Sequence, residues 1–70
     1  MEELLKISEK GWTFVVLNAE TKDKRFQARA ESPDGKLYRG GSYITDNEAR
    51  LAIADARSSV KEGKTPWLSL

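Results

Sequence analysis

Apolar and polar residues alternate through the middle of the chain with the period of a β-strand. The segment RFQARAE places Phe26, Ala28 and Ala30 on one side and charged or amide side chains on the other, because successive strand side chains point to opposite faces. The preceding run WTFVVLNA is rich in β-branched and aromatic residues and has apolar residues on both sides. It predicts a strand that is central in its sheet or covered on both faces.

A turn and a third strand follow these two. The sequence SPDG puts Pro33 at the first central position of a turn, with Asp-Gly directly after it, an order that suits the backbone angles of a tight turn. The next run, KLYRGGSYI, predicts the third strand. Gly40 and Gly41 inside it indicate a bulge or a close approach of another part of the chain.

The last third of the chain has the period of an amphipathic helix. TDNE predicts a capping box, in which the Thr45 hydroxyl accepts from the Glu48 amide and the Glu48 side chain returns to the Thr45 amide. Ile44 stands where a hydrophobic staple would. Gly63 is placed to end the helix, and Pro66 prevents its continuation. The apolar side of this predicted helix consists of Ala49, Ala52, Ile53, Ala56 and Val60.

The first segment, EELLKISEKG, predicts a short N-terminal helix. Leu4, Leu5 and Ile7 would form its apolar side, and Gly11 would end it. A helix of this length is marginal alone and needs to pack against the rest of the domain. The alternative for this segment is a frayed N-terminal arm.

The resulting fold class is α+β, with a short N-terminal helix, a three-stranded antiparallel meander and a C-terminal helix packed on one face of the sheet. We expect a single domain over residues 1–65 and an apolar C-terminal tail over residues 66–70.

Composition narrows the chemistry. The 70 residues include neither cysteine nor histidine, so disulfides are excluded and the commonest metal ligands and general base are missing. A serine nucleophile would have no histidine to activate it, and the chain has no glycine-rich phosphate loop. We therefore expect a non-catalytic protein with no cofactor and no metal.

Charge and length bear on the partners. The formal net charge is only +1, which does not by itself favour nucleic acid. No apolar run approaches the ~20 residues of a membrane span, and the start lacks the features of a secretory signal, so we expect a cytoplasmic protein with no membrane contact. A domain this small gains stability by docking with a partner. We expect a protein partner or a second copy, as in a homodimer.

The order of predicted elements resembles the double-stranded-RNA-binding domain, over most of the chain. TDNEAR falls where that family carries Ser or Thr, two lysines, any residue, Ala and another lysine. Of the matching positions Asp46, Asn47 and Arg50, only Arg50 keeps the positive charge. AETKDK lacks the proline and histidine of the family's minor-groove loop. The resemblance thus implies the fold, with most of the RNA-binding groups missing.

A second, weaker resemblance is to the YegP-like small bacterial domains. It rests on the alternating strand with its turn, on GGSYIT, and on a helix ending in ARSSVKEG. That family implies no particular biochemical role. The matching positions are Phe26, Arg29, Ala30, Gly35, Ser42, Tyr43, Ser59, Val60 and Lys61.

Two surfaces are candidates for binding. One is the polar face of the predicted sheet, because arginine and glutamine suit the edges of bases in duplex DNA; plain solvation of that face is the alternative. The other joins the second face of the first strand to the apolar tail, as a protein interface. The candidate nucleic-acid contacts are Arg25, Gln27, Arg29, Lys36, Arg39 and Arg50, and the candidate protein contacts are Val15, Leu17, Trp67, Leu68 and Leu70. We expect a small binding module for a protein, itself included, with nucleic acid as the alternative.

Overall fold

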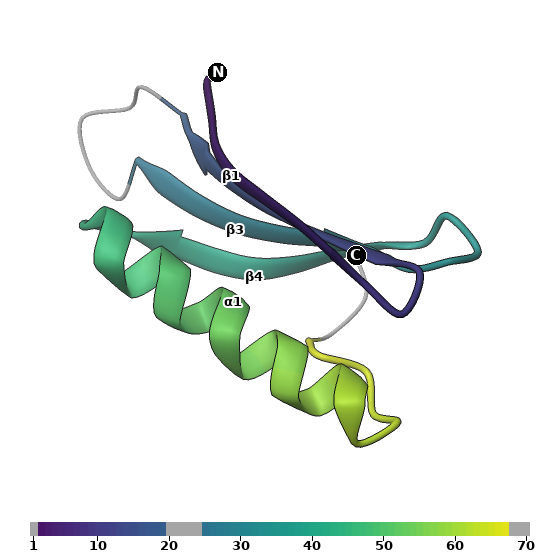
Figure 1. Cartoon of the computed structure of the whole chain (residues 1–70). Helices are drawn as coiled ribbons and strands as arrows, with labels where there is room; N and C mark the ends of the chain where they lie inside the picture. Colours follow the sequence, from purple (N-terminus) through teal and green to yellow (C-terminus); the bar gives the residue numbers. More distant parts are fainter. Residues whose placement is uncertain (1, 20–24, 68–70) are drawn as a thin grey trace.

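A four-stranded antiparallel sheet carries one helix on one of its faces (Figure 1). The computed structural model describes residues 2–19 and 25–67. Each strand pairs with the next along the chain, so the sheet order is β1-β2-β3-β4. The small domain is α+β, as predicted, but it has four strands rather than three. The elements are β1 (Glu2–Glu9), β2 (Trp12–Asn18), β3 (Phe26–Glu31), β4 (Leu37–Tyr43) and α1 (Asp46–Lys61).

The N-terminal segment is a strand, so the predicted N-terminal helix is wrong. Leu5 and Ile7 pack against the core, whereas Lys6 and Ser8 are exposed. This alternation has the period of a strand and not of a helix. β1 is also paired with β2 along its length, and this long-range pairing outweighs the weak preference of a short segment for a helix.

Gly11 closes a β-hairpin instead of ending a helix. Glu9 pairs with Trp12, which leaves Lys10 and Gly11 as a two-residue loop with φ angles of 51° and 83°. Positive φ at both central residues is the geometry of the type I′ turn, whose twist matches that of the flanking strands. The glycine marks a reversal of the chain, as predicted, but of a different kind.

The turn between β3 and β4 forms at the predicted SPDG sequence. Ser32 and Lys36 close it with a backbone bond of 2.9 Å from Ser32 N to Lys36 O. Gly35 adopts a φ of 87°, which favours glycine. The Ser32 hydroxyl donates to the Asp34 carboxylate and accepts from the Lys36 amide at 3.0 Å. These two hydrogen bonds fix the loop from inside.

The N-terminus of α1 has the predicted cap but not the predicted staple. Thr45 is the N-cap residue, and its hydroxyl accepts from the Glu48 amide at 3.2 Å. The Glu48 carboxylate accepts from the same hydroxyl at 3.2 Å rather than from the Thr45 amide. Ile44 is 67% exposed, so it does not staple the helix. The Thr45 hydroxyl therefore caps the Glu48 amide without the reciprocal bond of a capping box.

A Schellman motif ends α1, with Gly63 just after the helix as predicted. The Gly63 amide donates to the Val60 carbonyl at 3.0 Å, and the Lys64 amide donates to the Ser59 carbonyl at 2.9 Å. Gly63 has a φ of 79°, the left-handed conformation that this motif requires.

The core lies between the sheet and α1, and the predicted packing of the alanine-rich helix face on the sheet is confirmed. Phe14 and Val16 of β2 are fully buried. Trp12 stacks on Phe14 with ring centroids 6.1 Å apart. Trp12 and Phe26 are partly buried and pack against this core. Small side chains on both surfaces bring the helix close to the sheet. The other buried apolar residues are Ala28, Ala30, Tyr38, Ala49, Ile53, Ala56 and Val60.

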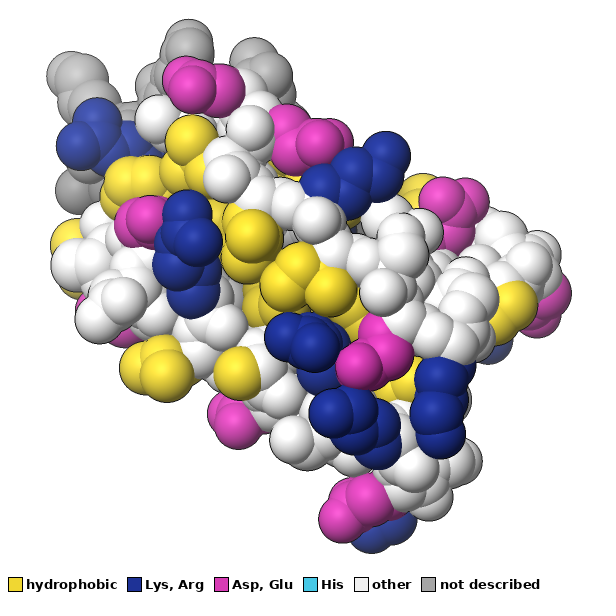
Figure 2. Space-filling view, in the orientation of Figure 1, with side chains coloured by type: hydrophobic (Ala, Val, Ile, Leu, Met, Phe, Trp, Pro, Cys, Tyr) yellow, Lys and Arg dark blue, Asp and Glu magenta, His cyan; other side chains and the backbone are white. Residues whose placement is uncertain are grey.

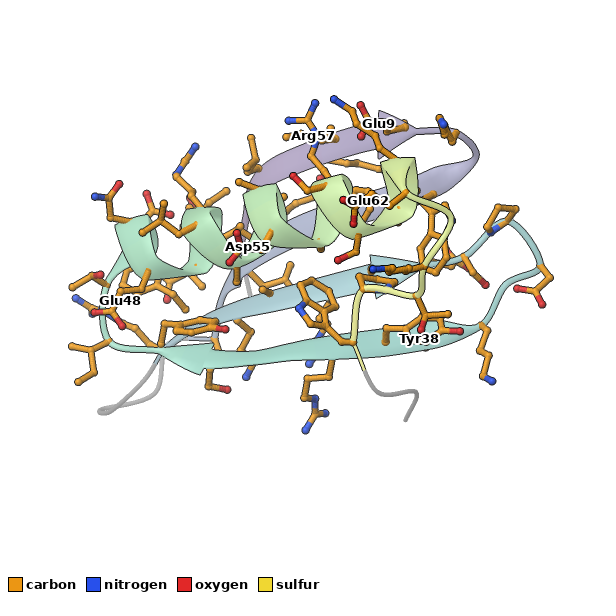
Figure 3. The ribbon with its side chains drawn as sticks, turned by 90° about the horizontal axis from the view of Figure 1, so that it is seen from below. Glu9, Tyr38, Glu48, Asp55, Arg57 and Glu62 are labelled. Atoms are coloured by element: carbon orange, nitrogen blue, oxygen red, sulfur yellow. The ribbon has the colours of Figure 1, made fainter. Side chains whose placement is uncertain are left out.

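Glu9, at the end of β1, ties this outer strand to the helix. Its carboxylate lies 3.4 Å from the Arg57 guanidinium and 3.7 Å from the Lys61 ammonium, and Figure 3 shows Arg57 and Glu9 side by side. The hydrogen bond from Arg57 and the nearby positive charges hold the pKa of Glu9 below its ordinary value, although partial burial opposes the shift.

Candidate binding surface on the open face of the sheet

The sheet face opposite α1 is the candidate site, because no element in the described part of the chain covers it (Figure 1). Its side chains are the ones that alternate with the buried residues of each strand. The strand with apolar residues on both faces was predicted to be central or covered on both faces, and β2 is a central strand. The structure covers only the face that bears Phe14 and Val16.

One row of side chains runs straight across this open face and supplies most of its charge. Lys6 of β1 is paired with Val15 of β2, Val15 with Arg29 of β3, and Arg29 with Arg39 of β4. Each strand therefore contributes one residue, and residues that are directly opposite in antiparallel strands have neighbouring side chains. We call these four residues the cationic row.

A mixed row lies on each side of the cationic row. Each contains one acidic residue and at least one apolar residue, so the open face as a whole carries three cations and two acids. The two flanking rows are Ser8, Thr13, Glu31 and Leu37 on one side and Glu3, Leu17, Gln27 and Ser42 on the other.

The cations of the row form no ion pair with an acid in the described part of the chain. None of the ion pairs in residues 2–19 and 25–67 involves Lys6, Arg29 or Arg39. One Arg29 terminal nitrogen donates to the Gln27 side-chain oxygen at 2.8 Å, and the buried Nε of Arg29 has no partner among the described residues. Like charges directly opposite one another destabilise a sheet. An anionic group bound over the row would relieve that repulsion.

Apolar side chains surround the cations. Val15 and Leu17 are half-buried, and Leu37 is 56% exposed. Together with Lys6 and Arg29 they line a shallow hollow with a volume of about 270 Å³. The surface can therefore bind a ligand that has both apolar and anionic groups, and in this respect it differs from a plain solvated sheet.

Only some of the predicted nucleic-acid contacts meet on this surface. Gln27, Arg29 and Arg39 come together there, but Lys36 lies over the Tyr38 ring at 5.8 Å and Arg50 forms an ion pair of 2.9 Å with Asp46 on α1. Tyr38 and α1 belong to the other face of the sheet, so Lys36 and Arg50 are not part of the site. The exposed guanidinium of Arg25, just before β3, lies 5.5 Å from the Phe26 ring.

Lys6 was missed because its segment was taken for a helix. Strict alternation of Leu5, Lys6, Ile7 and Ser8 is the signal that assigns it to the face opposite the core. That signal covers only four residues and is easily outweighed by the two leucines side by side.

The predicted protein interface is divided between two places. Val15 and Leu17 lie on the open face, as predicted. Trp67 does not cover them, because its ring packs beside the core on the helix side, against Gly40. The segment that follows α1 leads back to β4 on the helix side of the sheet and places Trp67 there. Leu68 and Leu70 lie outside the described residues.

Within residues 2–19 and 25–67, no group of three or more acidic, cysteine or histidine residues is arranged to hold a metal ion. In the same ranges no helix has the length and apolar character needed to cross a membrane.

Comparison with known proteins gives no match: no protein-family model, curated protein or solved structure is similar to this chain at a significant level. The resemblances to the double-stranded-RNA-binding domain and to the YegP-like domains stay predictions. The first of them implied a helix before the sheet, and a strand occupies that place.

Proposed function

We propose that the chain is a non-catalytic protein-interaction module that binds its partner on the open face of the sheet. The observation that carries this proposal is the arrangement of Val15, Leu17 and Leu37 around three cations that form no ion pair with the described acids. Exposed apolar groups next to unpaired charges are typical of interaction sites. Sheet faces in small domains are usually covered by a further layer, and a partner would supply it.

A photo-crosslinking residue in place of Leu37 tests this proposal in the cells that produce the chain. Leu37 points from the open face and is 56% exposed, so we expect covalent adducts with a protein. The same residue in place of Lys64, which is exposed beyond the end of α1, is the matched control. Equal adducts at both positions, or no protein adduct at Leu37, would overturn the proposal.

Nucleic acid is the second candidate, and one observation favours it. Gln27 and Arg29 are hydrogen-bonded to each other beside Arg39, and such side chains suit base edges in the major groove. The flanking carboxylates of Glu3 and Glu31 would repel phosphates. Among the described residues no aromatic side chain lines the hollow on this face, so the stacking that binds single strands is not provided there.

Titration with duplex DNA, duplex RNA and single strands at low ionic strength separates the two candidates. Binding to nucleic acid would weaken steeply as salt rises, because bound counterions are released from the phosphates. A chain that shows no binding to any of the three at low salt would exclude this second candidate.

A further inference from the structure

A second surface of the molecule carries unpaired charge of the opposite sign. Glu48, Leu51 and Asp55 lie on the exposed side of α1, and Leu51 is 63% exposed. We call these three residues the acidic stripe. Figure 3 shows Glu48 and Asp55 along one side of α1, while Arg57 points toward Glu9. In the described part of the chain neither acid of the stripe belongs to an ion pair.

The ion pairs of Arg50, Arg57 and Lys61 on α1 are all with acids outside this stripe. Figure 2 shows Lys and Arg side chains gathered over the C-terminal half of α1, with acidic side chains among them. Arg57 and Lys61 account for part of this gathering, and both are paired with Glu9 of β1. The cations of the helix thus serve contacts within the molecule, and the acids of the stripe remain available.

The distance between neighbouring charged residues is about the same in the cationic row and in the acidic stripe. In the cationic row, Lys6 and Arg29 stand on strands two apart with Val15 between them, so their Cα atoms are about 10 Å apart.

Along the helix, Glu48 and Asp55 are seven residues apart, which is also about 10 Å. Leu51 lies between them, as Val15 lies between the two cations of the row. The stripe and the Lys6–Val15–Arg29 part of the row therefore each have the order charge, apolar side chain and charge, with about the same length and opposite sign.

We propose that the acidic stripe of one copy docks across the cationic row of a second copy, so that the chain assembles head to tail. This inference rests on the proposed function and names the partner as the chain itself. Within one molecule the two surfaces cannot meet, because α1 covers the sheet face opposite the cationic row (Figure 1). The contact is heterologous, so each copy offers one surface and accepts on the other.

Two other arrangements fit the charges less well. Stacking the open faces of two copies would oppose one cationic row to another, and like charges across an interface suppress association. Nucleic acid on the row would bring phosphates beside Glu3 and Glu31 and would leave the acidic stripe uncovered. The head-to-tail arrangement pairs both sets of unpaired charges and buries Leu51 against Val15 and its apolar neighbours.

Sedimentation of the full chain from micromolar to millimolar concentration gives the first test. We expect association that grows with concentration and weakens as ionic strength rises, because the contact is between opposite charges. A chain that stays monomeric at millimolar concentration and low ionic strength would overturn the inference.

Charge reversal on one surface at a time gives the sharper test. We expect R29E/R39E and E48K/D55K each to weaken self-association at least about tenfold, because each opposes like charges across the contact. Every copy of either variant still keeps one native surface. An equal mixture should restore association, because the native stripe of the first variant can dock on the native row of the second and the two reversed surfaces are again opposite in charge.

The controls keep the outcome unambiguous. K10E/K64E makes the same change of net charge as R29E/R39E but outside both surfaces, and it should associate like the original chain. R29Q/R39Q removes the cations without reversing them and serves if a reversed variant does not fold. Association that persists in the folded sheet variants, or a mixture that gives only monomers, would refute head-to-tail docking. Protein adducts at Leu37 in a chain that stays monomeric would refute it too, and would leave the proposed function standing.

Discussion

At the scale of single residues, Gly40 shows how one missing side chain positions the C-terminal segment. An added Cβ at this position would overlap the Trp67 ring, and the Tyr43 hydroxyl donates to the Gly40 carbonyl at 2.6 Å. β4 is also irregular here, because the register with β3 shifts between Ala28 and Arg29. The sequence predicted a bulge or a close approach at this glycine pair, and the structure has an irregular register there together with the approach of the Trp67 ring.

Gly40→Ala is expected to destabilise the domain by about 1–3 kcal/mol, because Trp67 must leave its place to make room. The measurement is urea unfolding, followed by circular dichroism. In a Trp67→Ala background the same substitution should cost much less, since the obstructing ring is gone. An equal cost in the two backgrounds would mean that Trp67 does not pack on Gly40.

Because of Glu9, the stability of the folded domain is expected to depend on pH in the acid range. The Arg57 hydrogen bond and the nearby positive charges lower the pKa of Glu9 in the folded chain, so its contribution is fully present above the ordinary pKa of glutamate. The contribution is lost as the pH falls through the lowered pKa. We expect Glu9→Gln to flatten part of the acid limb of a plot of melting temperature against pH. Glu2→Gln, at an exposed glutamate outside the ion pairs of the described residues, should leave the limb unchanged.

At the scale of elements, the difference between α1 and β1 explains what the sequence could predict. The signals that specify α1 lie within its own segment: a capping threonine, an apolar face that repeats over 16 residues and a glycine just after its end. These signals are local, so its bounds were predicted closely. In β1, Leu4, Leu5 and Ile7 pack against the core, and the adjacent leucines interrupt the alternation that would mark a strand. The structure of β1 depends on pairing with β2, and no local pattern encodes that pairing.

The candidate site divides in the same way. Alternation along β3 predicted that Gln27 and Arg29 share a face, and their neighbour Arg39 followed from the next strand. Lys6 could not be predicted while its strand was taken for a helix. The cationic row depends on the register of three strand pairs, which is set by hairpin geometry and burial together.

The hairpin between β1 and β2 offers a direct test of that element. Lys10 adopts a φ of 51°, which is uncommon for lysine and well tolerated by asparagine. Lys10→Asn should stabilise the domain by about 0.5 kcal/mol, and Lys10→Val should destabilise it. Thermal unfolding of the two variants beside the original chain measures both effects. If the N-terminal segment were frayed or helical, Lys10→Asn would not raise the stability and Lys10→Val would not lower it.

At the scale of the whole molecule, one small core supports two opposite surfaces. All the fully buried side chains lie between α1 and one sheet face, so the open face contributes little to folding and is available for binding. The same division applies to α1, whose inner side is buried and whose outer side carries the acidic stripe.

Ile53 and Leu51 are matched apolar residues on opposite sides of α1, and alanine at each should separate folding from association. Ile53 is 1% exposed, so Ile53→Ala should cost about 2–5 kcal/mol, comparable to the ~3–5 kcal/mol that the core of such a small domain supplies. Leu51 is 63% exposed, so Leu51→Ala should change the free energy of unfolding by less than about 0.5 kcal/mol and still weaken self-association. Urea unfolding of dilute protein and sedimentation of concentrated protein measure the two effects. If Leu51→Ala unfolds the domain, or leaves association intact, the exposed side of α1 does not serve as a separate docking surface.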